Sequence, residues 1–254
     1  MPIDSQTLEQ LRDLLVTRAG GYLRNPIIER DVTCVVCQTP CIGYRWCVRC
    51  NNQRDEAGPR ADQVASLTYA VNGRQSGWIM RGYKAPVPTP EHAQIVLLTT
   101  VVGLGYHGEC AGNRLGAPVT HWTVVPSMPA KPVEHPMRRL AAPAAPGIEV
   151  QLIGAATSAH PREIDPEHYT SPPLPAGSHV LLIDDTWTGG GHAQSAVLAV
   201  RAAGAAYASV LNVARWIEPA WQIPEYDNNA GFLAQRCARD YDPMICPWTG
   251  ASCS

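Results

Sequence analysis

Two groups of residues in this sequence carry side chains suited to chemistry: paired cysteines near the N-terminus and paired aspartates in the C-terminal half. The cysteines form two Cys-x-x-Cys pairs with nine residues between them. A tetrahedral zinc ion takes soft thiolate ligands, and each pair can supply two of the four. All four positions are then filled, so we expect a structural rather than a catalytic zinc. The expected ligands are Cys34, Cys37, Cys47 and Cys50.

Other cysteines follow no such spacing. Cys41 lies between the two pairs and could be a spare or an exchanged ligand. Free thiols in a core are the alternative interpretation of the whole segment, but its "TPCIGYRW" stretch is polar and rich in turn-forming residues. Cys237, Cys246 and Cys253 are irregularly spaced, and we interpret them as structural or incidental, with a second metal site as the alternative.

The aspartates belong to the stretch "HVLLIDDTWTGGGHAQ", residues 179–194. Its apolar run from Val180 to Ile183 predicts a short buried strand, which places Asp184 and Asp185 at the carboxyl end of that strand. Three glycines follow, and the Ala-rich segment after them predicts a helix. Ligands of open α/β sheets bind outside the carboxyl ends of strands, and a helix N-terminus favours an anion. The unit therefore predicts a site for a phosphorylated ligand.

Several kinds of phosphate loop could follow such a strand. A Walker-type loop needs a lysine after its glycines, whereas His192 follows Gly191 here. A dinucleotide fingerprint needs G-x-G-x-x-G with its acidic residue after the loop, which this stretch lacks. An acidic turn that only caps the helix is a further alternative. The order of apolar run, two acids, short step and Thr/Gly loop resembles the signature of type I phosphoribosyltransferases.

The elements that position these groups indicate an α/β protein. Predicted strands alternate with predicted helices, which is typical of a parallel sheet. A chain of 254 residues with 45% hydrophobic composition can bury one large core or two smaller ones. The expected strands cover 121–125, 148–153, 180–183 and 206–213, and the expected helices cover 4–18, 91–103 and a segment that starts at 193.

Charge and hydropathy narrow the classes of partner. The net charge of −2 gives no general electrostatic reason to bind nucleic acid or a membrane surface. The apolar stretch at 95–105 is too short to span a bilayer, and the N-terminus lacks the pattern of a signal peptide. Nine cysteines without a secretion signal favour reduced thiols or metal ligands, so we expect a cytoplasmic protein.

The combination of a two-knuckle ribbon with the acidic signature resembles the ComF family, over roughly residues 30–215. Two further stretches are similar to that family: "YAVNGRQSGWIMRGYKA" (69–85) and "WTVVPSMPAKPVEHPMRRLAA" (122–142). The resemblance implies a parallel-sheet type I phosphoribosyltransferase (Rossmann-like) core with a small N-terminal zinc ribbon. It divides the chain into a helix-and-ribbon part at 1–58 and a phosphoribosyltransferase-like part with a C-terminal extension at 59–254.

The resemblance also implies roles at the site. Asp184 and Asp185 would be catalytic and would accept hydrogen bonds from the ribose hydroxyls of phosphoribosyl pyrophosphate. Magnesium would bridge pyrophosphate and ribose oxygens, largely through waters. The implied 5-phosphate cradle is Thr188, Gly189, Gly190, Gly191, His192 and Ala193; the implied pyrophosphate contacts are Pro126, Ser127 and Arg139, with Lys131, Arg138, Arg81 and Lys84 as further cations.

Two functions follow as expectations. The first is transfer of the phosphoribosyl group to an unidentified nitrogen nucleophile, such as a base or ammonia. The second is a non-catalytic protein that binds phosphoribosyl pyrophosphate or acts through partners in DNA uptake. Gly189 and His192 replace hydroxyl residues of the family pattern, and "HPMRRL" replaces its Arg-Gly-Phe-Asn stretch, which favours the second. Three arginines beside the cysteine pairs could also contact a nucleic-acid backbone: Arg45, Arg49 and Arg54.

Overall fold

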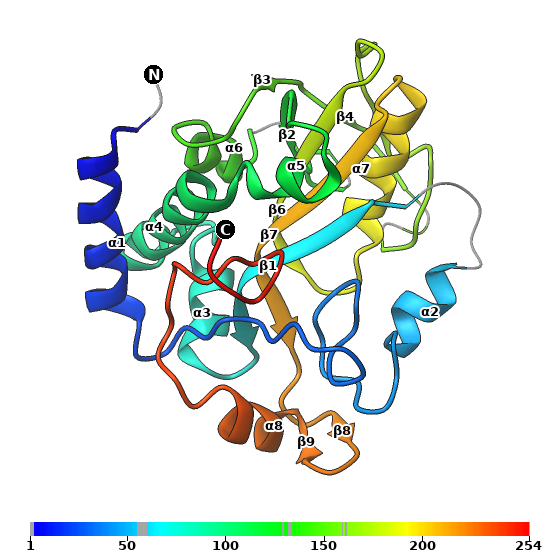
Figure 1. Cartoon of the computed structure of the whole chain (residues 1–254). Helices are drawn as coiled ribbons and strands as arrows, with labels where there is room; N and C mark the ends of the chain where they lie inside the picture. The colour runs from blue at the N-terminus through cyan, green and yellow to red at the C-terminus, as the bar shows by residue number, and fades with distance from the viewer. Residues whose placement is uncertain are drawn as a thin grey trace.

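A five-stranded parallel sheet forms the centre of the molecule (Figure 1). Its strands are β1 (Gln63–Val71), β2 (His121–Val124), β3 (Ile148–Glu149), β6 (His179–Trp187) and β7 (Tyr207–Ile217). They lie in the order β1-β7-β6-β2-β3, and all neighbouring pairs are parallel. The α/β class with a parallel central sheet is therefore confirmed. This computed structural model describes residues 3–54, 60–128, 130–131, 134–158, 160 and 162–253.

Helices cover both faces of the sheet. One face carries α3 (Gln75–Gly82), α4 (Pro90–His107) and α6 (Pro136–Ala141), with α1 (Ser5–Ala19) packed outside α4. The opposite face carries α7 (Gly191–Ala202), which packs against β6 and β7. The result is a three-layer α/β/α arrangement.

Shorter elements lie around these layers. Helix α2 (Val48–Arg54) lies at the end of the cysteine-rich segment (residues 32–53), α5 (Cys110–Leu115) follows α4, and α8 (Asn229–Arg236) lies in the C-terminal part. Two small antiparallel hairpins complete the described elements: β4 (Ile153–Gly154) with β5 (Tyr169–Thr170), and β8 (Gln222–Ile223) with β9 (Asp227–Asn228).

The alternation of side chains along β6 separates two layers of core. Leu181 and Ile183 belong to the layer shared with α4, whereas Val180 and Leu182 belong to the layer shared with α7. All four side chains are at most 1% exposed. A strand that is buried on both faces is apolar without interruption, which explains the continuous run that predicts it.

Most predicted elements are present, several of them longer than expected. The helix predicted over 4–18 is α1, and the helix predicted over 91–103 is α4. The single strand predicted over 148–153 is wrong: β3 ends at Glu149, and Ile153 pairs antiparallel with Thr170 outside the central sheet. β3 is the edge strand of the central sheet, and its ladder with β2 stops at Glu149. Ile153 pairs instead with β5 in a separate two-stranded sheet.

Both ends of the chain pack on the central core. Leu15 and Ala19 of α1 are fully buried and share a core layer with Tyr241 and Trp248 from the C-terminal segment. Figure 1 shows that this C-terminal segment runs back toward α4. The predicted boundary between residues 58 and 59 lies outside the described residues.

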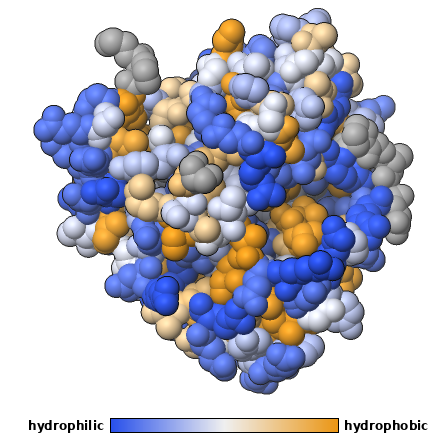
Figure 2. Space-filling model, in the orientation of Figure 1, coloured by the Kyte–Doolittle hydropathy of each residue, from blue (hydrophilic) through white to orange (hydrophobic). Residues whose placement is uncertain are grey.

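The surface is mostly hydrophilic on the face shown in Figure 2, and its apolar side chains gather in the middle and lower part. Three exposed apolar side chains come from the cysteine-rich segment: Val35, Tyr44 and Val48. Among the described residues, no helix has both the length and the apolar composition needed to cross a membrane.

We expect Leu15→Ala to lower the free energy of unfolding by about 2–5 kcal/mol, because it empties a fully buried position beneath α4. The neighbouring Val16→Ala, at a side chain that is 41% exposed, is the matched control and should change stability by no more than about 0.5 kcal/mol. Urea unfolding of both variants measures the difference. Equal small effects would contradict the packing of α1.

Candidate functional site

The first cysteine pair lies in a tight loop. The Cys34 amide donates to the Thr39 carbonyl at 2.8 Å, and the Gln38 amide donates back to the Cys34 carbonyl at 2.9 Å. Gln38 has a φ of +60°, which reverses the chain direction. Thr33 and Pro40 close the loop as an isolated antiparallel bridge. The loop therefore holds both of its cysteines, Cys34 and Cys37, in buried positions.

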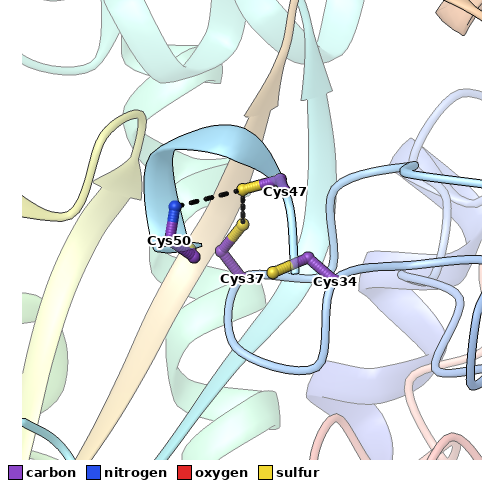
Figure 3. Close-up of side chains that lie close together, drawn as sticks. All are labelled: Cys34, Cys37, Cys47 and Cys50. Carbon is purple, nitrogen blue, oxygen red and sulfur yellow. Dashed lines mark hydrogen bonds between the residues drawn. The ribbon is translucent and has the colours of Figure 1, made fainter. Parts of the chain in front are cut away.

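The second pair lies where α2 begins, and it completes a cluster of four thiols. All four Sγ atoms lie within 4.8 Å of one another (Figure 3), and those of Cys37 and Cys47 are 3.7 Å apart. Zn–S bonds of about 2.3 Å in tetrahedral geometry place sulfurs about 3.8 Å apart. The four predicted residues thus form a cluster that could bind zinc. Cys41 does not belong to this group of four, and its thiol donates to the Tyr44 carbonyl at 3.2 Å.

Helix α2 connects the cysteine cluster to the glycine loop before α7. The Arg49 guanidinium donates to the Gly189 carbonyl and to the Arg162 carbonyl, each at 3.1 Å. The side-chain amide of Gln53 also donates, through Nε2, to the Gly189 carbonyl at 3.0 Å. The conformation of the glycine loop therefore depends on residues next to the thiols.

The expected phosphate cradle, residues 188–193, surrounds the N-terminus of α7. Gly190 has a φ of +79°, and a Cβ there would collide with the Trp187 indole. A Cβ on Gly191 would collide with the Arg162 carbonyl. These glycines are needed because other parts of the protein pack closely on this helix end, at which the 5-phosphate is expected.

The acidic pair lies on β6, close to its carboxyl end. The strand does not end at Ile183, as predicted, but continues to Trp187, because Asp184 lies opposite Asn212 and the ladder with β7 runs on. Successive side chains of a strand point to opposite faces. Asp184 is therefore directed to the α7 face and Asp185 to the face that carries α3 and α6.

Asp185 is buried among polar partners. Its Oδ2 accepts a hydrogen bond from the Tyr83 hydroxyl at 2.6 Å and forms an ion pair with the Lys84 ammonium. His135 Nε2 lies 3.8 Å from the same oxygen. The Asp185 amide donates to Asp184 Oδ1 at 2.8 Å, so the two residues are also linked directly.

The two carboxyl groups differ in protonation. Burial, followed by repulsion from Asp185, raises the pKa of Asp184 to about 8. Burial also acts to raise the pKa of Asp185, but Lys84 and the Tyr83 hydrogen bond outweigh it, and the pKa falls below its ordinary value. Asp185 is therefore the member of the pair that favours the ionised form, whereas Asp184 keeps its proton to a higher pH than an ordinary aspartate.

The loop after β2 lies beside the acidic pair. Val124 is opposite Ile183 in the sheet, and the Val125 amide donates to the Ile183 carbonyl at 3.0 Å. Pro126 and Ser127 follow directly, and the Pro126 carbonyl accepts from the Tyr169 hydroxyl at 3.0 Å. The structure thus brings Pro126 and Ser127 to the same edge as the aspartates.

The expected cations are distributed unequally around the pair. Lys84 contacts it directly. Arg138 and Arg139 form ion pairs with Glu134, and the Arg139 side chain is 79% exposed. Arg81 stacks over a tryptophan ring, 4.5 Å from its centroid. Lys84 is therefore the best-placed of these cations.

Tyr83 and His135 are site residues that the sequence does not predict. His135 caps α6 by accepting from the Met137 amide through Nδ1, so Nε2 carries its proton and faces Asp185. Burial lowers the pKa of His135, and Lys131 lowers it further. Tyr83 directly precedes Lys84, but nothing in their spacing shows that they meet a strand 100 residues later.

A groove of about 1690 Å³ begins at the other side of the glycine loop. Thr188 and Arg215 line it together with the cysteine-rich segment and Trp221, but neither aspartate does. This groove and the acidic pair are therefore separate features.

No protein-family model matches this chain, and no curated protein matches it. An open α/β sheet hosts many unrelated activities. Function must therefore be inferred from the residues gathered at the site.

We expect Cys37→Ser to lower the zinc content by about one ion per chain, because it removes one thiolate of a closed four-ligand site. Cys41→Ser is the matched control and should keep all of the zinc, since Cys41 lies outside the cluster. Elemental analysis of protein purified without added metal measures both. Equal losses in the two variants would contradict the ligand set.

The raised pKa of Asp184 makes stability depend on pH. The folded state binds the Asp184 proton more tightly than the unfolded state does. The resulting stabilisation is fully present below about pH 3.8, the ordinary pKa of an aspartate, and it is lost as the pH rises through about 8. Asp184→Asn removes this dependence. Urea unfolding at pH 5 and pH 8.5 should show the variant gaining stability relative to the parent at the higher pH. A pH-independent difference would contradict the burial of this carboxyl.

Proposed function

We propose that this protein binds phosphoribosyl pyrophosphate at the carboxyl edge of its sheet and transfers the phosphoribosyl group to a nitrogen nucleophile. The observation that carries the proposal is the placement of Asp184 and Asp185 on β6, between the N-terminus of α7 and the loop after β2. This edge is where open α/β sheets bind ligands. The resemblance to the ComF family supports the same assignment.

The acidic pair suits a ribose. An ionised Asp185 accepts hydrogen bonds from ribose hydroxyls and offsets positive charge on the sugar as the anomeric C–O bond breaks. A C–N bond forms to the nucleophile, and negative charge leaves with pyrophosphate. Lys84, which is paired with Asp185 in the free protein, is the nearest cation for that charge. Pro126 and Ser127 would contact the pyrophosphate through their backbone.

The donor set fits magnesium that arrives with its ligand. Carboxylate oxygens suit this hard cation, which keeps several waters. Asp185 is already paired with Lys84, and Asp184, which is directed to the opposite face of the sheet, has a raised pKa. Magnesium would therefore be held mainly by pyrophosphate oxygens and waters, with Asp185 as its one carboxylate, and the ion would neutralise charge on the leaving group.

One observation favours a protein that does not transfer the phosphoribosyl group, because it weakens the site for the 5-phosphate. The Arg162 carbonyl packs against Gly191 at the end of α7, and Gly189 and His192 supply no side-chain hydroxyl there. An acceptor at the helix end weakens a site for an anion. Release of pyrophosphate from phosphoribosyl pyrophosphate, tested with ammonia and a panel of bases, separates an enzyme from a binding protein.

A nucleic-acid interface at the cysteine-rich segment has less support. Arg49 is used to hold the glycine loop. Arg45 and Arg54 stack over Trp46, at 4.7 and 4.0 Å from its ring centroid. Each of the three arginines thus already contacts another residue of the protein.

We expect Asp185→Asn to weaken binding of magnesium and phosphoribosyl pyrophosphate about tenfold to a hundredfold, since hydrogen bonds to a charged acceptor contribute about 1.5–3 kcal/mol. Titration calorimetry measures the affinity. Ribose 5-phosphate should bind more weakly to the parent, because it lacks pyrophosphate.

The matched control is Asp62→Asn. Asp62 is also paired, with Arg201, but it lies just before β1, at the amino edge of the sheet. It should leave the affinity unchanged. An unchanged affinity in Asp185→Asn, or no binding to the parent at millimolar ligand, would refute the proposed site.

A further inference from the structure

Four potential metal ligands from separate parts of the chain meet at the end of α4. His107 ends α4 and Cys110 begins α5, whereas Cys246 and Cys253 come from the C-terminal segment. His107 Nδ1 and the three Sγ atoms all lie within 4.8 Å of one another. Cys253 Sγ is 3.1 Å from His107 Nδ1 and 3.3 Å from Cys110 Sγ.

The histidine presents a lone pair to the three thiols. His107 is 1% exposed, and its Nε2 lies 2.8 Å from the Pro243 carbonyl. A carbonyl oxygen only accepts, so Nε2 carries the proton and Nδ1 is unprotonated in the neutral ring. Metal-binding histidines are held in this way, with the second nitrogen donating to a carbonyl or carboxylate.

The C-terminal cysteines are held by a tight loop. The Cys246 amide donates to the Ala251 carbonyl, and the Gly250 amide donates back to the Cys246 carbonyl, each at 2.8 Å. Gly250 has a φ of +76°. Ile245 and Ser252 close the loop as an isolated antiparallel bridge.

This loop has the same construction as the loop of the first cluster. In both, the first cysteine bonds to the carbonyl five positions later, the residue at the fourth position has positive φ and donates back, and the flanking residues form a bridge. Cys34 and Cys41 correspond to Cys246 and Cys253. The position of Cys37 is taken by Thr249.

We propose that His107, Cys110, Cys246 and Cys253 bind a second structural zinc ion. The C-terminal loop lacks the internal Cys-x-x-Cys partner, and the α4–α5 junction supplies the missing ligands. Three thiolates and one imidazole complete a tetrahedral set, which suits zinc and leaves no open position. The proposal does not rest on the phosphoribosyl site.

The ion fastens the C-terminal segment to the central core. Beside it, the Trp248 indole donates to the His107 carbonyl at 3.1 Å, and Arg114 donates to the Trp248 carbonyl at 2.7 Å. Trp248 is only 4% exposed. These contacts fix the loop in the position that its two thiolates need.

Zinc content of the full chain, purified without added metal, tests this site. We expect about two ions in the parent and about one in Cys253→Ser, because a closed site needs all four ligands. Cys37→Ser should also retain about one ion, and the double variant almost none. Cys237→Ser is the matched control, since this buried cysteine lies outside both clusters, and it should keep both ions.

Alkylation of thiols gives a readout that needs no variant. Cys253 is exposed, so an alkylating reagent can reach its thiol unless a metal protects it. We expect slow labelling of Cys253 in the purified protein and fast labelling after a chelator removes zinc. One zinc per parent chain, two ions in Cys253→Ser, or a Cys110–Cys253 disulfide in the purified protein would each overturn the proposal.

Discussion

The burial of β6 on both faces is the constraint on which the rest of this structure depends. Helices α4 and α7 take opposite sides of its apolar run, so the strand is apolar from Val180 to Ile183 and carries its acidic side chains toward its carboxyl end. There the chain places two aspartates in succession, and the alternation of the strand sends them to different faces. The buried carboxylate of Asp185 is compensated by side chains from two separate segments, Tyr83 and Lys84 at the end of α3 and His135 at the start of α6. The position of the acidic site thus follows from the burial of β6 between the two layers of helices.

The elements that the sequence predicts best are those whose buried positions are mostly apolar. β6 contains a continuous apolar run, α4 is apolar along most of its length, and α1 and α7 have apolar residues at helical spacing; the prediction of all four elements is confirmed. β1 was missed because buried polar residues interrupt its pattern: Thr68 is 2% exposed, yet its hydroxyl is satisfied by the Arg24 carbonyl. The cysteine spacing predicted the first cluster because its ligands are close in sequence. Tyr83 and His135 could not be predicted, since only the packing of separate elements brings them to Asp185.

The cysteine-rich segment and the glycine loop are mechanically connected. Arg49 and Gln53 both donate to the Gly189 carbonyl from a helix that begins at the thiol cluster. Arg49 also holds the Arg162 carbonyl, which packs on the end of α7. A metal that orders the thiols therefore also sets the shape of the loop. The ribbon-like segment has a role in positioning this edge of the sheet, in addition to its own stability.

The repeated cysteine loop has different consequences at its two locations. The first loop finds its partners nearby, with the Cys37 and Cys47 thiols only 10 positions apart. At the second location the Cys110 and Cys253 thiols lie 3.3 Å apart although 143 positions separate them in the sequence. A bond that closes a longer stretch of chain removes more freedom from the unfolded ensemble, and this ratio of lengths corresponds to about 2 kcal/mol of additional loop entropy. The same cysteine loop thus contributes to a local cluster near the N-terminus, whereas a metal ion bound at the C-terminal loop would cross-link distant parts of the chain.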